Sequence, residues 1–276
     1  MRTETIHLKD HFPFLGENNC DPTLDLFLPF NLTEMGRQNQ KRPSILICPG
    51  GGYAGVSQRE GEPIGLHFLQ EGCNVFVLTY SVAPNRFPTQ LREVAAAMEL
   101  IHRHSEEWNC DTGRVAIMGF SAGGHLAAHY STCYDSPEVR EVFPSSHPVA
   151  ASILCYPVIT ADPAYSHQGS FINLTGHDPI TAADIEKFSC EKQVTPHTPP
   201  AFLWHTAADN GVSVMNSLLY AGALADHHIP FELHVYPFGC HGLATVDEHT
   251  NNGLDANTAH AAAWLPAVRK WLKLIF

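Results

Sequence analysis

A serine flanked by glycines is the group of residues in this chain that most clearly suggests chemistry. Residues 119–123 read Gly-Phe-Ser-Ala-Gly, with an apolar run before them (RVAIMGF) and a helix-like run after them (GGHLAAHYS). A tight turn between a strand and a helix projects the serine oxygen above a sheet, and glycines on either side avoid collisions there. The pattern therefore predicts that Ser121 is a nucleophile. An ordinary strand–turn–helix with an inert serine is the alternative.

Three consecutive glycines follow another apolar run. The run SILI leads into Pro49–Tyr53, which reads PGGGY. Glycines leave backbone N–H groups open to a ligand, and a tetrahedral intermediate needs such donors for its oxyanion. We predict that the amides of Gly51 and Gly52, with that of Ala122 after the serine, form an oxyanion hole. A phosphate-binding loop is the rival interpretation, but neither G-x-G-x-x-G nor GK[ST] is present.

An acid and a base follow later apolar runs, in the order serine, acid, histidine that accompanies this type of serine turn. Asp209 comes shortly after the run AFLWH, and His241 follows the run ELHVY. Both positions correspond to the carboxyl ends of strands, where open α/β sheets bind their ligands. We predict that Asp209 orients His241, which takes the proton of Ser121. The chain order disfavours the rival acids, which are Asp184, Asp226 and Asp247.

The remaining histidines and the cysteines show no metal-binding pattern. The chain has 18 histidines and 8 cysteines, but it contains no H-E-x-x-H sequence and no Cys/His cluster. We therefore expect no metal ion and no cofactor.

Alternating strand-like and helix-like runs surround these residues and would have to position them. Most of the strand-like runs are continuously apolar, as in a parallel sheet that is covered on both faces. The predicted strands are Ser44–Cys48, Val75–Tyr80, Arg114–Phe120, Ser152–Tyr156, Ala201–His205 and Glu232–Tyr236. The helix-like runs are Leu91–Ile101, Leu126–Tyr130, Val214–Leu224 and Ala259–Leu274.

This alternation predicts an α/β fold, with a doubly wound, mostly parallel sheet and helices on both faces. We expect antiparallel edge strands from Ile6–Leu8 and Leu24–Phe30. No repeat or linker divides the chain, so a single domain over residues 1–276 is predicted. The stretch from about residue 131 to residue 200 has weaker periodicity, and we expect an irregular insertion there near the active site.

The charge balance narrows the range of partners. There are 16 Lys and Arg residues against 28 Asp and Glu residues, a net charge of −12. Nucleic acid and anionic membranes attract basic surfaces, so neither is expected as a partner. No run approaches the roughly 18 apolar residues of a membrane span, and no apolar stretch near the N-terminus suggests a secretory signal. The scattered cysteines include no C-x-x-C pair, so we expect reduced thiols and a cytoplasmic location.

These motifs together resemble the bacterial esterase/lipase group of α/β-hydrolases that includes acetyl-xylan-esterase-like and feruloyl-esterase-like proteins, distant relatives of hormone-sensitive lipase. The resemblance implies ester hydrolysis through Ser121, Asp209 and His241. Pro49 stands where the related loop has a histidine, and Ser213 stands where a proline often follows the acid; neither departure removes a group that the chemistry needs. The matching segments are PGGGY (49–53), REGEPIG (59–65), LTYSVAP (78–84), GFSAGGHLAAHYST (119–132), HTAADNGV (205–212), NSLLYAGAL (216–224) and GCHGL (239–243).

The residues and the resemblance together predict a serine carboxylesterase for short acyl groups, which forms an acyl-enzyme on Ser121. Tyr53 and Phe87 are bulky residues near the glycine loop, and we expect them to bind substrate by closing the acyl side. The expected partner is a small-molecule ester, and homo-oligomerisation is left open. The first alternative is a dedicated carbohydrate deacetylase. A peptidase is less favoured, because the chain has no room for a large gating domain. A catalytically inactive ligand-binding module is also less favoured, because such modules typically lose the base that His241 supplies.

Overall fold

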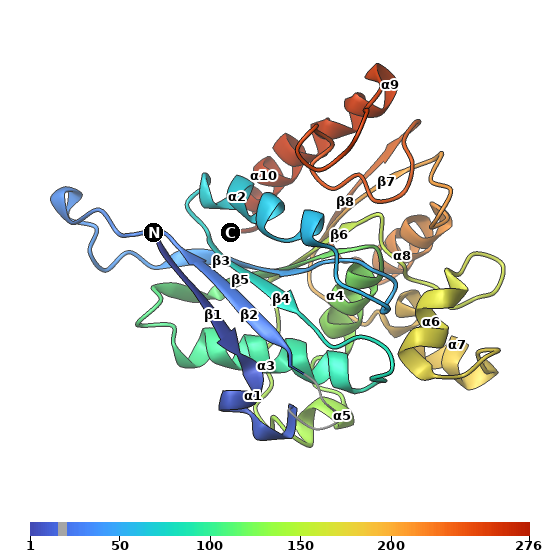
Figure 1. Ribbon diagram of the computed structural model, residues 1–276, viewed down its shortest axis with the longest axis horizontal. Helices are drawn as coiled ribbons and strands as arrows, with labels where there is room; N and C mark the ends of the chain where they lie inside the picture. Colours follow the sequence, from blue (N-terminus) through green and yellow to red (C-terminus); the bar gives the residue numbers. More distant parts are fainter. Residues whose placement is uncertain (16–20) are drawn as a thin grey trace.

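An eight-stranded sheet runs through the protein, seen in a computed structural model that describes residues 1–15 and 21–276 (Figure 1). Its strand order is β1-β2-β4-β3-β5-β6-β7-β8. Strand β2 pairs antiparallel with β1 and with β4, and the pairs from β4 to β8 are parallel. In chain order, the strands are β1 (Arg2–His7), β2 (Thr23–Leu28), β3 (Arg42–Cys48), β4 (Asn74–Thr79), β5 (Cys110–Phe120), β6 (Ala151–Cys155), β7 (Ala201–Thr206) and β8 (Phe231–Tyr236).

Helices cover both faces of this sheet. In Figure 1, α2 and α10 lie above the sheet and α3 lies below it. The α-helices are α1 (Leu8–His11), α2 (Glu62–Leu69), α3 (Thr89–Arg103), α4 (Ser121–Cys133), α5 (Pro137–Arg140), α6 (Gln168–Thr175), α7 (Ala182–Phe188), α8 (Met215–Asp226), α9 (Ala256–Ala259) and α10 (Trp264–Ile275). Short 3₁₀ turns are η2 (Thr33–Met35), η3 (Gln58–Glu60), η4 (Cys190–Gln193) and η5 (His260–Ala263).

The two layers follow from the alternation of side chains along each strand. In β4, Phe76 and Leu78 belong to the core shared with α3, α4 and α8. Val75 and Val77, on the opposite face, belong to the core shared with α2 and α10. Both faces are apolar, so burying the strand requires helices on each side.

The α/β-hydrolase fold predicted from the sequence is confirmed, including the antiparallel edge formed by β1 and β2. Each predicted strand is present with shifted ends. Helix α2 was not predicted, and the last helix begins at Trp264 rather than Ala259 because η5 precedes it. The expected irregular stretch from about residue 131 contains β6 and the short helices α5, α6 and α7, none longer than eight residues.

Two further sequence expectations concern membranes and cysteines. No helix in the described part of the chain is both long and apolar enough to cross a membrane. Cys20 lies outside the described residues, and the other seven cysteines form no disulfide with one another.

Candidate active site

The turn that carries Ser121 joins β5 directly to α4. Ser121 has a φ of 52°, in the left-handed region that side chains rarely adopt. A Cβ at Gly119 would lie 2.1 Å from the carbonyl oxygen of Gly123, and a Cβ at Gly123 would lie 2.1 Å from that of Cys48. The glycines on either side are therefore required by contact with the backbone, which is the reason the sequence pattern suggested.

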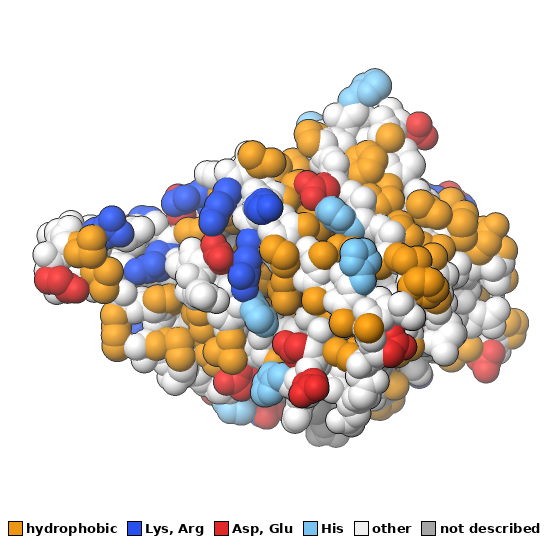
Figure 2. Space-filling model, turned by 90° about the horizontal axis from the view of Figure 1, so that it is seen from above, with side chains coloured by type: hydrophobic (Ala, Val, Ile, Leu, Met, Phe, Trp, Pro, Cys, Tyr) orange, Lys and Arg blue, Asp and Glu red, His pale blue; other side chains and the backbone are white. Residues whose placement is uncertain are grey.

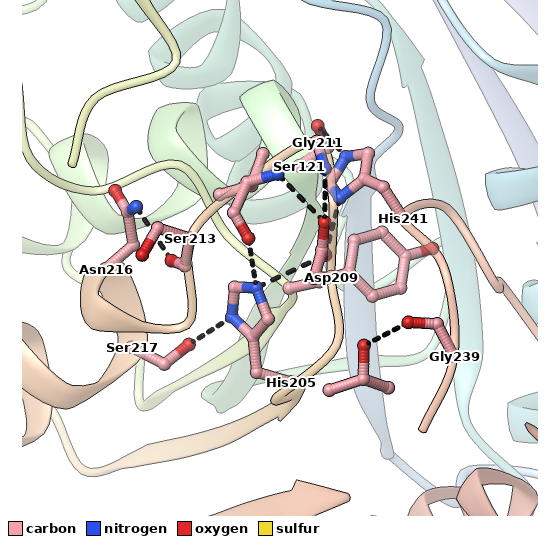
Figure 3. Close-up of polar contacts among 12 residues, drawn as sticks. Ser121, His205, Asp209, Gly211, Ser213, Asn216, Ser217, Gly239 and His241 are labelled. Carbon is pink, nitrogen blue, oxygen red and sulfur yellow. Dashed lines mark hydrogen bonds and ion pairs between the residues drawn. The ribbon is translucent and has the colours of Figure 1, made fainter. Parts of the chain in front are cut away.

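Asp209 and His241 lie beside this serine (Figure 3). The His241 Nε2 atom is 2.7 Å from Ser121 Oγ, and its Nδ1 atom is 2.8 Å from Asp209 Oδ2. The other carboxylate oxygen, Asp209 Oδ1, accepts hydrogen bonds of 2.8 Å from the amides of Gly211 and Val212. These contacts hold the Asp209 carboxylate from both sides, in the orientation that an acid needs in order to position the histidine base.

A second histidine, His205, approaches the same carboxylate from the interior (Figure 3). Its Nε2 atom is 3.3 Å from Asp209 Oδ2 and 3.0 Å from the carbonyl oxygen of Val212, while its Nδ1 atom is 2.8 Å from Ser217 Oγ. With a hydrogen on Nε2, the ring donates toward the Val212 carbonyl and the Asp209 carboxylate, while Nδ1 accepts from the Ser217 hydroxyl. Burial opposes ionisation of Asp209, but hydrogen bonds from His205 and His241 outweigh it and hold the pKa of the carboxyl group well below its usual range.

The glycine loop after β3 presents free backbone donors near the serine. Gly51 and Gly52 have φ values of 133° and 65°. A Cβ at Gly51 would lie 2.1 Å from the carbonyl oxygen of Gly55, so this position accepts only glycine. The amides of Gly51 and Gly52 find no acceptor among residues 1–15 and 21–276. Ala122 lies at the first turn of α4, where backbone N–H groups have no partner within the helix.

Glu60 connects this glycine loop to the loop that carries His241. Its side chain is buried, with Oε2 accepting a 2.8 Å hydrogen bond from the amide of Gly50 and Oε1 accepting one of 2.7 Å from the Tyr156 hydroxyl. The Tyr156 oxygen in turn accepts from the amide of Ala244, three residues after His241. The carboxylate therefore fixes two catalytic loops relative to one another. The sequence analysis named Glu60 only as part of segment 59–65, which matches the related esterases, and gave it no role.

The substitution Glu60→Gln tests this link. An amide presents one acceptor where the carboxylate presents two, so either the Gly50 amide or the Tyr156 hydroxyl loses its partner, at a cost of about 1–3 kcal/mol. If the loops must hold their places in the transition state, kcat should fall by about ten-fold to a hundred-fold with little change in KM. The matched control is Glu62→Gln, at an exposed carboxylate two residues away.

Both variants should be compared at a temperature at which circular dichroism shows them folded. Wild-type kcat in folded Glu60→Gln would contradict a positioning role and leave Glu60 a structural residue only.

The cavity that contains Ser121 has a volume of about 460 Å³ and mostly polar or glycine walls. Residues from the irregular stretch contribute to it through His167, Gly169 and Asn173, at and within α6. Its remaining lining residues are Gly51, Gly52, Ala54, Ser57, Arg59, Glu60, His241 and Gly242.

Comparison with known proteins shows the family of this chain. A protein-family profile, BD-FAE, matches residues 24–224. The chain belongs to the BD-FAE family. Among solved structures, this BD-FAE protein is similar to the acetyl ester-xyloside bifunctional hydrolase of Caldicellulosiruptor lactoaceticus, with a TM-score of 0.85, 33% identity, and coverage of 99% of this chain and 97% of that one. It is also similar to the carboxylesterase Cest-2923 of Lactobacillus plantarum WCFS1, with a TM-score of 0.83, 27% identity, and coverage of 99% and 98%.

Two curated relatives of the BD-FAE protein are longer than this chain. Endo-1,4-beta-xylanase B of Butyrivibrio fibrisolvens is 37% identical over 238 residues, 82% of this chain and 36% of that protein. The acetylxylan esterase of Xylanibacter ruminicola is 33% identical over 211 residues, 75% of this chain and 42% of that protein. The chain thus spans less than half the length of either relative. The esterase family expected from the sequence is confirmed.

Tyr53 and Phe87, the expected substrate-binding residues of this BD-FAE protein, are not among the residues that line the cavity with Ser121. The Tyr53 side chain is buried, with its hydroxyl 2.8 Å from His125 Nδ1. Phe87 packs against the rings of His129 and Phe188. Both aromatic rings therefore belong to the packing behind the glycine loop.

No metal site accompanies these residues in the part of the chain that the structure describes. Within it, no group of three or more His, Cys, Asp or Glu side chains is arranged to hold an ion.

Proposed function

We propose that this BD-FAE protein is a serine carboxylesterase, and the hydrogen-bonded series Ser121–His241–Asp209 carries this proposal. Ser121 Oγ attacks the ester carbonyl while His241 Nε2 takes its proton, and Asp209 stabilises the resulting imidazolium. The amides of Gly51, Gly52 and Ala122 donate to the oxyanion. His241 then returns the proton to the departing alcohol, and water, activated by the same histidine, releases the acid from Ser121.

The lining of the cavity favours short acyl groups. Each methylene of an acyl chain contributes about 0.8 kcal/mol when it is buried against an apolar wall. Among the residues that line the cavity, four are glycines, one is an alanine, and none has a large apolar side chain that could form a deep wall for a long chain. Added methylenes therefore gain little, and we propose that acetyl and butyryl esters are the preferred substrates.

A series of p-nitrophenyl esters tests this proposal. We expect kcat/KM to be highest for the acetate or butyrate and to fall strongly for the octanoate and palmitate, because the cavity of about 460 Å³ has no large apolar side chain to bury the longer chains. A rate that rises steadily through palmitate, with activation at an oil–water interface, would instead make this protein a lipase.

A dedicated carbohydrate deacetylase is the second candidate function. The names of two similar proteins favour it, one an acetylxylan esterase and the other an acetyl ester-xyloside hydrolase. It uses the same groups on the acyl side and differs only in the alcohol that the protein binds. Comparing an acetylated sugar with p-nitrophenyl acetate distinguishes a dedicated deacetylase from a general esterase.

The proposed partner is a small-molecule ester, without nucleic acid or membrane. In Figure 2, basic side chains gather on one side of the visible face, and acidic side chains lie among and around them. The net charge of −12 supports the same proposal, because polyanions would be repelled.

A cytoplasmic location is supported by the seven described cysteines, all unpaired, and cell fractionation tests it.

A further inference from the structure

The chemistry of ester cleavage determines where the alcohol part of the substrate lies. His241 Nε2 must reach the departing oxygen to protonate it, so the alcohol extends from Ser121 toward the loop that carries His241. On that side of the site lies a second cavity of about 600 Å³. It is bounded by residues next to Asp209 and by the loop from Phe238 to Thr258.

Arg59 lies between the two cavities and lines both. Its Nη1 atom donates a 2.8 Å hydrogen bond to the carbonyl oxygen of Thr250, in the loop that bounds the second cavity. A Cβ at Gly242 would lie 3.4 Å from Nη2, which places the guanidinium beside the residue that follows His241. Among the described residues no carboxylate lies within ion-pair distance of it, so its remaining N–H groups are available to a ligand.

Exposed carboxamides give the second cavity its chemical character. The side chains of Asn210, Asn252 and Asn257 line it, are exposed, and form no hydrogen bond with the described residues. A carboxamide both donates and accepts, which matches the hydroxyl groups of an uncharged ligand. A phosphate or carboxylate ligand would call for several cations, and here Arg59 is accompanied by the acidic Asp255.

One aromatic side chain, that of Phe238, lines this cavity. Phe238 has 52% of its surface exposed, which is unusual for a side chain of its size. The C–H face of a pyranose ring offers an apolar surface to such a ring, while its hydroxyls face the carboxamides. The cavity volume lies within the range of about 300–1,000 Å³ that is usual for small-molecule sites.

We propose that this second cavity, the Asn210–Asn257 cavity, is a subsite for the carbohydrate alcohol of the ester, holding a sugar unit next to the acylated one. The inference rests on the proposed esterase function, since the position of the alcohol follows from the role of His241. It makes an acetylated oligosaccharide a better substrate than an acetylated monosaccharide, and it assigns Phe238 and Asn257 to specificity on the alcohol side.

Kinetics with two acetylated sugars test the subsite. The substrates are an acetylated xylotriose and an acetylated methyl xyloside, and the measured quantity is the ratio of their kcat/KM values. We expect this ratio to exceed one in the wild type and to fall by about ten-fold in Phe238→Ala and in Asn257→Ala, because each loses one buried contact to the added sugar. The matched controls are Phe30→Ala and Asn39→Ala, at exposed positions on and near the loop that carries η2, and these should keep the wild-type ratio.

A binding measurement separates failure of the subsite from failure of the esterase proposal. Unacetylated xylotriose should bind the wild-type protein in a calorimetric titration and bind Phe238→Ala more weakly. A ratio of one in the wild type, or an unchanged ratio in both cavity variants, overturns the subsite even when p-nitrophenyl acetate is hydrolysed. If no ester is hydrolysed, the esterase proposal fails, and the titration alone then decides whether the cavity binds sugar.

Discussion

Replacing Ser121 with alanine is expected to lower kcat for p-nitrophenyl acetate by about 10⁶-fold, because the nucleophile that forms the acyl-enzyme is lost. The fold should survive, since Ser121 is small and its side chain hydrogen bonds only to His241 among the described residues. A steady-state assay with protein shown to be folded by circular dichroism measures the effect.

Ser131→Ala is the matched control for this variant. Ser131 lies in the same helix, is buried, and donates its hydroxyl only to the carbonyl oxygen of Ala127 one turn earlier. We expect it to keep wild-type activity. If folded Ser121→Ala retained more than a few per cent of the wild-type rate, another group would have to be the nucleophile.

The substitution Asp209→Asn has the second largest expected effect, a loss of roughly 10⁴-fold in kcat. An amide group facing His241 Nδ1 favours the tautomer whose Nε2 carries a proton, and that nitrogen cannot then accept one from Ser121. The substitution also removes the charge that stabilises the imidazolium. Rates for hydrolysis of p-nitrophenyl acetate by the folded variant measure the loss.

Asp226→Asn is the control for this prediction, because Asp226 ends α8 and its side chain is exposed. It should keep the wild-type rate. A large loss in Asp226→Asn together with a mild effect in Asp209→Asn would show that the orienting acid has been misassigned.

The rival acids that the chain order disfavoured have other contacts in the structure. Asp184 forms a capping box with Thr181 at the start of α7. Asp247 accepts hydrogen bonds from Thr245 and from the amide of His249, within its own turn. Chain order could separate them from Asp209 because the position of an acid after a particular strand is a local property of the sequence.

The strands, the serine turn and the glycine loop could be predicted for the same reason. Each depends on a continuous apolar run followed by residues whose backbone needs are visible locally, as at Gly119 and Gly123.

The supporting residues could not be predicted in this way. Glu60 takes its role from Tyr156, 96 residues away, and His205 from the approach of the Asp209 loop and of α8. A single glutamate in a polar segment has the pattern of a surface residue until the fold brings its partners together. The direction of the Tyr53 ring also could not be predicted from the sequence. Its left-handed φ of 56° and its contact with His125 are set by tertiary packing.

Labelling with a serine-directed p-nitrophenyl phosphonate tests the central claim most directly. The reagent should phosphonylate the wild-type protein once, in proportion to the loss of esterase activity, and peptide mass spectrometry should locate the group on Ser121. His241→Ala should react far more slowly, because Ser121 then has no base. Full activity in the presence of the reagent, or a single label on a different residue that accounts for the inactivation, would contradict the assignment of Ser121 as the nucleophile.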